Sequence, residues 1–173
     1  MKMYKKVILA LLFVLSGLAF ATPSFSLQVV QKDGSETVVF EASYMIEQVI
    51  LDYFYEHAYI VSNSPVIIQK KNVDVSVDLQ KSFDAAQEGS LDLIIQLVVT
   101  YNLSDSNNPE EAVLSNIDLI EWKAVSLSDR SVVVQGKAIP SKKYRDDDDG
   151  LSYFANELAS NIKSALETKG GKK

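Results

Sequence analysis

Residues 92–103 alternate between apolar and polar side chains more regularly than any other part of this sequence. The odd-numbered positions are leucine, isoleucine, valine or tyrosine, whereas Gln96, Thr100 and Asn102 stand at even-numbered positions. Successive side chains of a β-strand point to opposite faces of its sheet, so this pattern predicts a strand with one buried face and one mostly exposed face. The rest of the chain must therefore supply elements that cover the buried face.

Three segments have the apolar spacing that is typical of amphipathic helices. Residues 43–57 have apolar residues at three- and four-residue intervals, with acidic and amide residues opposite. Residues 151–166 have an apolar stripe along their whole length, and we expect this helix to cover the strand at 92–103. A shorter helix at 79–86 is predicted to end at Gly89 in the left-handed conformation that caps many helices.

The first strands are predicted to form a hairpin. The segments 27–31 and 36–40 flank Asp33 and Gly34, two residues that both accept the positive φ of a two-residue turn. With that turn, the apolar side chains of both segments share one face. The alternative is that the first segment frays and only the second forms a strand.

A second antiparallel hairpin is predicted from residues 115–127 and 131–139, joined by a polar turn at 128–130. The apolar positions of the first segment change parity near Leu119, which a β-bulge explains. The side chains on the apolar face of the second segment become smaller toward its end, which suggests that a helix packs closely there. That face consists of Val132, Val134, Gly136 and Ala138.

Residues 59–62 predict a short strand, whereas 66–68 and 73–77 fit either short strands or the approach to a helix. The order of these elements predicts an α+β fold: a single domain with a mainly antiparallel sheet and about three helices packed on one face of it. The polar loop at 104–111 is expected to be exposed and mobile.

The first residues resemble a cleavable signal peptide. Three lysines precede an apolar run at 7–15, and Ala19 and Ala21 supply the small-x-small pattern of a signal peptidase site. An uncleaved anchor is the alternative, but the apolar stretch is shorter than the roughly 20 residues that a membrane-spanning helix needs. We therefore expect a signal peptide at 1–21, a single α+β domain at 22–167 and a disordered tail at 168–173.

The charge and the absence of cysteine exclude several classes of function. Removal of the three leader lysines leaves 14 basic residues against 23 acidic ones, a formal charge of −9. Such an acidic domain is unsuited to nucleic acid and to anionic lipid surfaces, which require a basic footprint. The chain has no cysteine, so disulfides, cysteine catalysis, thiolate metal sites and a cysteine-linked lipid anchor are all excluded.

Four consecutive aspartates, Asp146–Asp149, permit two interpretations. Carboxylate oxygens in a loop suit a hard cation such as Ca²⁺, but consecutive residues cannot all face one centre and the alternating spacing of a calcium loop is missing. Aspartates before a helix also accept hydrogen bonds from its free N–H groups and face the positive end of its dipole. We expect the aspartates to cap the helix at 151–166 and predict no metal site.

Other candidate groups have no visible catalytic partner. His57, the single histidine, is expected to lie at the end of a helix, where it interacts with exposed carbonyl groups. Asp118 and Glu121 beside Trp122 are similar to the carboxylate pair and aromatic platform of a glycosidase, but Trp122 in so apolar a strand is expected in the core. We therefore predict no catalytic residues, no cofactor-binding residues, no metal ligands and no cofactor.

Tyrosines near the end of the first helix suggest a binding patch. Tyr53, Tyr55 and Tyr59 lie close together in the sequence, and apolar residues occupy more than half of the surface of helix 43–57. Either the domain buries this helix deeply or a partner covers the remainder. We expect partial burial, with Tyr55 and Tyr59 at a rim.

The stretch 85–95, AAQEGSLDLII, predicts a helix that ends in alanine and glycine before an apolar strand. Together with the hairpin at 122–136 and the helix at 151–166, it resembles small envelope domains of the curli-secretion-channel, penicillin-binding-protein-activator and Tol-translocation N-terminal group. This resemblance implies a non-enzymatic adaptor that docks another protein through a sheet edge or a helix face. The chain lacks the lipid-anchoring cysteine of the activators and channels.

We therefore expect an exported or periplasmic, non-enzymatic envelope protein that acts as an interaction or assembly adaptor. Its expected partner is another envelope protein, possibly itself, with no nucleic acid and no stable membrane insertion after leader cleavage. The alternative is a periplasmic carrier of a small apolar ligand. A deep cavity beneath Leu97, Val99 and Phe154 would favour the carrier, and a filled core would favour the adaptor.

Overall fold

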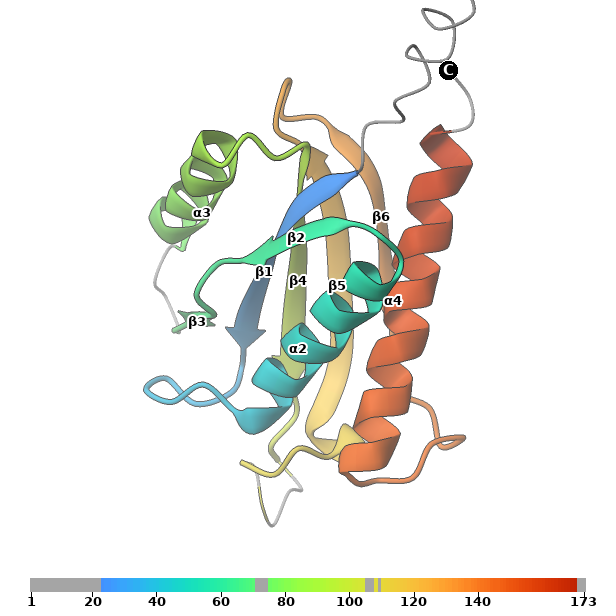
Figure 1. Ribbon diagram of the computed structural model, residues 1–173. Coiled ribbons are helices and arrows are strands. Elements are labelled where there is room, and N and C mark those ends of the chain that lie inside the picture. The colour runs from blue at the N-terminus through green and yellow to red at the C-terminus, as the bar shows by residue number, and fades with distance from the viewer. Residues whose placement is uncertain (1–22, 71–74, 105–107, 109, 171–173) are drawn as a thin grey trace, which may run out of the picture.

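The alternating segment forms the long strand β4 (Leu93–Tyr101) in the middle of a mixed sheet (Figure 1). The computed structural model describes residues 23–70, 75–104, 108 and 110–170, so the predicted leader lies outside the described residues. In this part of the chain the sheet has the order β2-β1-β4-β5-β6, and β3 also pairs with β1. The other strands are β1 (Ser24–Lys32), β2 (Ile60–Asn63), β3 (Ile67–Gln69), β5 (Ile117–Ser126) and β6 (Val132–Ala138).

The two halves of the sheet differ in strand direction. Strand β1 is parallel to β2, β3 and β4, whereas β4, β5 and β6 are antiparallel neighbours. Parallel neighbours need a crossover connection, and helices supply both crossovers. Helix α2 (Glu41–Glu56) leads from β1 to β2, and α3 (Ser76–Glu88) leads from β3 to β4. The predicted α+β fold with a single domain is confirmed.

The helices cover both faces of the sheet. Helices α2 and α4 (Asp148–Gly170) pack on one face, where the main core contains Leu97 and Leu158. The prediction that all helices lie on one face is wrong, because α3 packs on the other face against Ile94. This isoleucine stands at an even-numbered position of β4, so it interrupts the alternation and needs a cover of its own. The second cluster consists of Phe83, Ala86, Ile94 and Leu127.

The predicted first hairpin is wrong. Residues 33–40 form a loop without strand pairing, and the side chain of Gln31 holds this loop. Its Oε1 accepts a hydrogen bond from the N–H of Phe40 at 2.8 Å, and its Nε2 donates to the carbonyl of Val38 at 2.9 Å. The predicted two-residue turn needs a positive φ at both Asp33 and Gly34. Asp33 has a φ of 56°, but no described glycine has a positive φ, so this turn does not form. These side-chain bonds replace the ladder that a hairpin would provide.

The end of α3 differs from the prediction by one residue. Gly89 is right-handed, with φ −70°, and Ser90 instead adopts the left-handed conformation, with φ 56°. The N–H of Leu91 donates to the carbonyl of Ala86 at 3.2 Å, and that of Ser90 donates to Gln87 at 3.0 Å. These bonds satisfy carbonyl groups in the last turn of the helix. In this capping motif the left-handed position, occupied here by Ser90, is usually a glycine.

The second hairpin and its bulge are confirmed, but Val132 does not share the face of Val134. A register shift at Ala124 and Val125 leaves Val132 48% exposed, while Val133 packs against the main core. Thr100 pairs with Leu119 and Tyr101 pairs with Ile117, so Asp118 is the extra residue that shifts the register. In the next pair of strands Trp122 lies opposite Gly136. A Cβ atom at Gly136 would lie 2.6 Å from the indole Cζ2, so the indole ring explains the small residue there.

The remaining segments confirm part of the predictions. The short strands at 59–62 and 66–68 appear as β2 and β3, α3 begins at Ser76, and residues 71–74 lie outside the described residues. Described residues of the loop at 104–111 are exposed, and the others are not described. Helix α4 continues to Gly170, into the tail predicted to be disordered. Among the described residues, no helix has the length and apolar character needed to cross a membrane.

Candidate functional site

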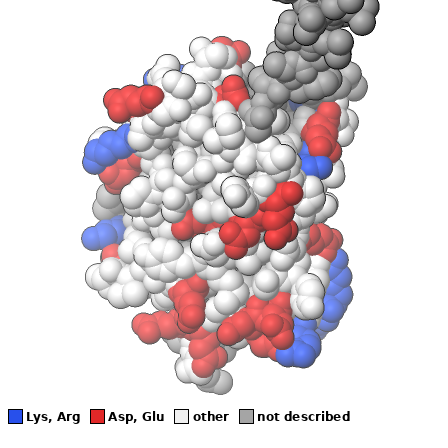
Figure 2. All heavy atoms as spheres, in the orientation of Figure 1, with Lys and Arg blue, Asp and Glu red and all other residues white. Residues whose placement is uncertain are grey.

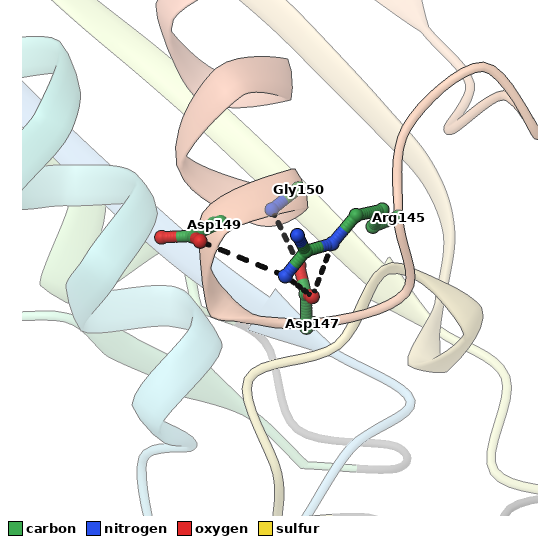
Figure 3. Close-up of polar contacts among 4 residues, drawn as sticks. All are labelled: Arg145, Asp147, Asp149 and Gly150. Carbon is green, nitrogen blue, oxygen red and sulfur yellow. Dashed lines mark hydrogen bonds and ion pairs between the residues drawn. The ribbon is translucent and has the colours of Figure 1, made fainter.

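Asp147 caps the N-terminus of α4, as the sequence predicts (Figure 3). Its Oδ1 accepts a hydrogen bond from the N–H of Gly150 at 2.9 Å, and its Oδ2 accepts one from Nε of Arg145 at 2.7 Å. The Gly150 N–H and then the Arg145 guanidinium hold the pKa of the Asp147 carboxyl below its usual range. Arg145 also lies 3.7 Å from Asp149. A guanidinium between two carboxylates occupies the place that a cation would need.

Asp146 is bonded to a different part of the chain. Asp146 accepts a hydrogen bond from the N–H of Ser115 at 2.8 Å, so it ties the loop before β5 to the loop before α4. Within the described ranges, no group of three or more acidic or histidine side chains is placed to hold a metal ion.

Replacement of Asp147 by alanine should lower the melting temperature by a few degrees, because the cap and the contact with Arg145 are both lost. Thermal unfolding followed by circular dichroism measures this shift. Millimolar Ca²⁺ should leave the wild-type melting temperature nearly unchanged. A rise of more than about 5 °C on adding Ca²⁺, absent in the Asp147→Ala variant, would instead establish a cation site.

His57 lies at the end of α2, as predicted. Its Nδ1 is 2.7 Å from the carbonyl oxygen of Tyr53, and its ring stacks on the Tyr53 ring with centroids 4.2 Å apart. These contacts hold the imidazole against its own helix. His57 therefore helps to terminate α2.

The three residues that are similar to a glycosidase centre do not form one. Asp118 and Glu121 are exposed on the sheet, whereas Trp122 is buried in the main core. Strand alternation puts Trp122 on the face opposite Glu121, so the indole cannot serve as a platform beside that carboxylate. The prediction of a core tryptophan is confirmed.

The interior beneath β4 is filled. Leu97 and Val99 have no exposed surface and belong to the same cluster as Phe154, which is 5% exposed. Tyr55 and Tyr59 are both predicted at a rim; Tyr59 is half-buried and packs edge-on against Phe54 with ring centroids 4.9 Å apart, whereas Tyr55 is 73% exposed. Buried side chains thus occupy the place where a carrier would need a cavity.

The outer side of α2 forms an acidic and aromatic stripe. Its six exposed residues follow one side of the helix, and the sequence of α2 contains no lysine, arginine or histidine. Figure 2 views the molecule from the side of α2, and acidic side chains lie across the middle and lower part of this face while basic ones lie near its edges. We call this surface the α2 stripe: Glu41, Tyr44, Gln48, Asp52, Tyr55 and Glu56.

The opposite side of the molecule has a half-covered sheet. Helix α3 lies over β1 and β4 and reaches β5 only near Val125, so Glu121 and Lys123 of β5 and Gln135 and Lys137 of β6 remain exposed. In register, Lys123 lies between Gln96 and Gln135, and Glu121 lies between Val98 and Lys137. These side chains line a shallow hollow of about 480 Å³. We call it the open sheet face: Gln96, Val98, Glu121, Lys123, Gln135 and Lys137.

Sequence reasoning missed the open sheet face. Its residues come from three strands, and alternation marks them only as exposed. The α2 stripe was foreseen in part, because the helix was expected to leave apolar and aromatic surface uncovered. Both surfaces depend on which helix covers which face of the sheet, and the local sequence does not determine that choice.

Glu47 is the buried charged residue of α2. It is 8% exposed, and its Oε1 has no hydrogen-bond partner among the described residues. Burial raises the pKa of the Glu47 carboxyl above its ordinary value, and a hydrogen bond with Asn63 offsets part of this rise. The folded protein therefore holds the proton of this group to higher pH than the unfolded chain does.

Replacement of Glu47 by glutamine should stabilise the protein at pH 7 by about 1 kcal/mol or more, because a neutral amide avoids the cost of a buried charge. The raised pKa means that the stability of the wild type falls as the pH rises above about 4, the unfolded value for glutamate. The gain should therefore shrink toward pH 4. Urea unfolding at both pH values measures it. If Glu56→Gln, on the exposed side of the same helix, gave an equal gain in stability, the effect would come from the change in net charge and not from burial of Glu47.

A family model described as "Uncharacterised protein" matches residues 24–167. The chain belongs to this family. The matched residues run from the start of β1 into the last turns of α4, so the family model covers every strand and helix of the described domain except the last residues of α4. A search of curated proteins found no match.

Solved structures resemble the fold of this family member. A PelC variant from Paraburkholderia phytofirmans, solved as a dodecamer, has a TM-score of 0.50 and 15% sequence identity, and the match covers 86% of this chain and 90% of that chain. The PelC dodecamer of the same organism has a TM-score of 0.49 and 16% identity, and covers 86% and 89%. At this identity the likeness to the PelC variant shows a shared fold.

Proposed function

We propose that this chain is an exported, non-enzymatic protein of the bacterial envelope that acts as an interaction or assembly adaptor. The proposal rests on one observation: the core is filled, while the α2 stripe and the open sheet face remain uncovered on opposite sides of the domain. Broad exposed surfaces suit another protein, and the α2 stripe adds the exposed tyrosines that are common at interfaces, whereas small ligands bind in enclosed apolar pockets. The filled core thus favours the adaptor over the carrier of an apolar ligand.

The environment of the candidate catalytic groups supports a non-enzymatic role. Asp118 and Glu121 lie on an exposed strand face, and His57 bonds with the carbonyl of Tyr53 in its own helix. None of these groups is buried beside a second titratable side chain among the described residues, which is the arrangement that tunes a catalytic pKa.

The proposed partner is another envelope protein or a second copy of this chain. The PelC variant that shares the fold is a dodecamer, which supports self-association as the first arrangement to test. The leader pattern at 1–21 supports export to the periplasm or beyond. The resemblance to curli-secretion-channel, penicillin-binding-protein-activator and Tol-translocation domains stays a prediction and agrees with this location.

Cross-linking in intact cells, followed by purification of the processed protein and mass spectrometry, tests the proposal. We expect a protein cleaved after Ala21 and cross-linked to an envelope protein or to itself. Replacing Tyr44 and Tyr55, which are 53% and 73% exposed, by alanine should reduce the cross-linked product. The matched control Val38→Ala, at a 52% exposed loop position, should not. A chain that retains residues 1–21, or one that is recovered without any cross-linked protein, would contradict the proposal.

A further inference from the structure

The two uncovered surfaces differ in charge. The α2 stripe contains Glu41, Asp52 and Glu56 with no basic residue, whereas the open sheet face contains Lys123 and Lys137 against a single glutamate. The six residues of the open sheet face thus have a net formal charge of +1, and the six of the α2 stripe have −3. The natural complement of each surface is therefore present on the other side of the same chain.

The two surfaces also differ in shape. Tyr44 and Tyr55 project from the α2 stripe with 53% and 73% of their surface exposed. The open sheet face is a hollow of about 480 Å³, and Trp122, which also lines it, is only 8% exposed. Tyrosine provides apolar contact area together with a hydroxyl group, so it suits burial against a face lined by amides and lysine stems.

We propose that the α2 stripe of one copy docks on the open sheet face of a second copy. This inference rests on the proposed adaptor function and specifies its partner and its surfaces. The two surfaces lie on opposite sides of the sheet, because α2 packs on the face that contains Leu97 and the open sheet face contains Gln96. A contact between two different surfaces is heterologous, so each copy can bind a further copy and the assembly closes into a ring or grows as a filament.

Charge reversal tests this arrangement. One variant is Lys123→Glu with Lys137→Glu, and the other is Asp52→Lys with Glu56→Lys. Each variant alone places like charges across the contact, so sedimentation velocity should show loss of the assembled species at low salt. An equal mixture of the two variants restores opposite charges at every contact of an alternating assembly. The mixture should therefore assemble again, which also shows that both variants are folded.

A matched control changes the same charge elsewhere. Lys142→Glu with Lys169→Glu alters two exposed lysines outside both surfaces, and this variant should assemble like the wild type. Wild-type assemblies that persist in both charge-reversed variants, or a mixture that stays monomeric, would overturn the docking inference and leave an adaptor that uses other surfaces. A wild-type protein that is monomeric at all concentrations and salt levels would overturn this inference and self-association together, and the cross-linking experiment then decides whether a different partner exists.

Discussion

Replacement of Leu97 by alanine will lower the free energy of unfolding by about 2–5 kcal/mol. Leu97 has no exposed surface and lies in the central strand, with Val29 beside it on β1 and Trp122 on β5. Truncation removes the transfer free energy of the side chain and leaves a cavity that its neighbours cannot fill without leaving their own contacts. Leu158 of α4 is 1% exposed in the same cluster, and we expect a loss in the same range there.

Urea unfolding measures these losses, and neighbouring residues supply the controls. Gln96→Ala and Asn161→Ala change side chains that lie on the outer sides of β4 and α4, so they should cost little stability. The total stability of a domain of this kind is roughly 5–15 kcal/mol, so Leu97→Ala removes a large share of it. If Leu97→Ala and Gln96→Ala were equally mild, the strand could not be half-buried, and the open sheet face would not exist as a separate surface.

The sequence predicts elements well where their pattern is local. The periodicities of β4, α2 and α4 follow from burial on one side, and the bulge at Asp118 follows from a change of parity that any aligned strand must absorb. The cap at Asp147 follows from side-chain chemistry within three residues of Gly150. Each of these features depends on residues that are close in the chain.

Prediction from the sequence fails where an element pairs with a segment that is distant in the chain. Strand β1 pairs with β4 although α2, β2, β3 and α3 separate them in the chain. Nothing near Asp33 and Gly34 indicates that the chain will turn into α2 instead of forming a hairpin. The amide of Gln31 decides that outcome through bonds to three backbone groups of the loop. The open sheet face depends in the same way on distant elements, because α3 covers β1 and β4 and reaches β5 only near Val125.

Replacement of Gly136 by alanine will lower the free energy of unfolding by about 1–3 kcal/mol. Two effects oppose each other at this position. Glycine in a strand costs about 0.5–1 kcal/mol relative to alanine, so backbone entropy alone would make the variant more stable. The added Cβ would lie 2.6 Å from Cζ2 and 2.8 Å from Cε2 of Trp122, closer than atoms of this kind approach one another. The ring is 8% exposed and packed in the main core, so it moves only by displacing its neighbours.

Trp122 is the single tryptophan of the chain, so its fluorescence reports on this site directly. A displaced indole should change its emission maximum in the folded Gly136→Ala variant, while urea unfolding gives the loss of stability. Gly89→Ala is the matched control, because Gly89 has φ −70° and the nearest atoms to an added Cβ lie at 3.5 Å. That variant should gain about 0.4–1 kcal/mol through the entropy of the unfolded chain and keep the wild-type emission. If both glycine variants were stabilised alike, with unchanged fluorescence, contact with Trp122 would not be the reason for a glycine in β6.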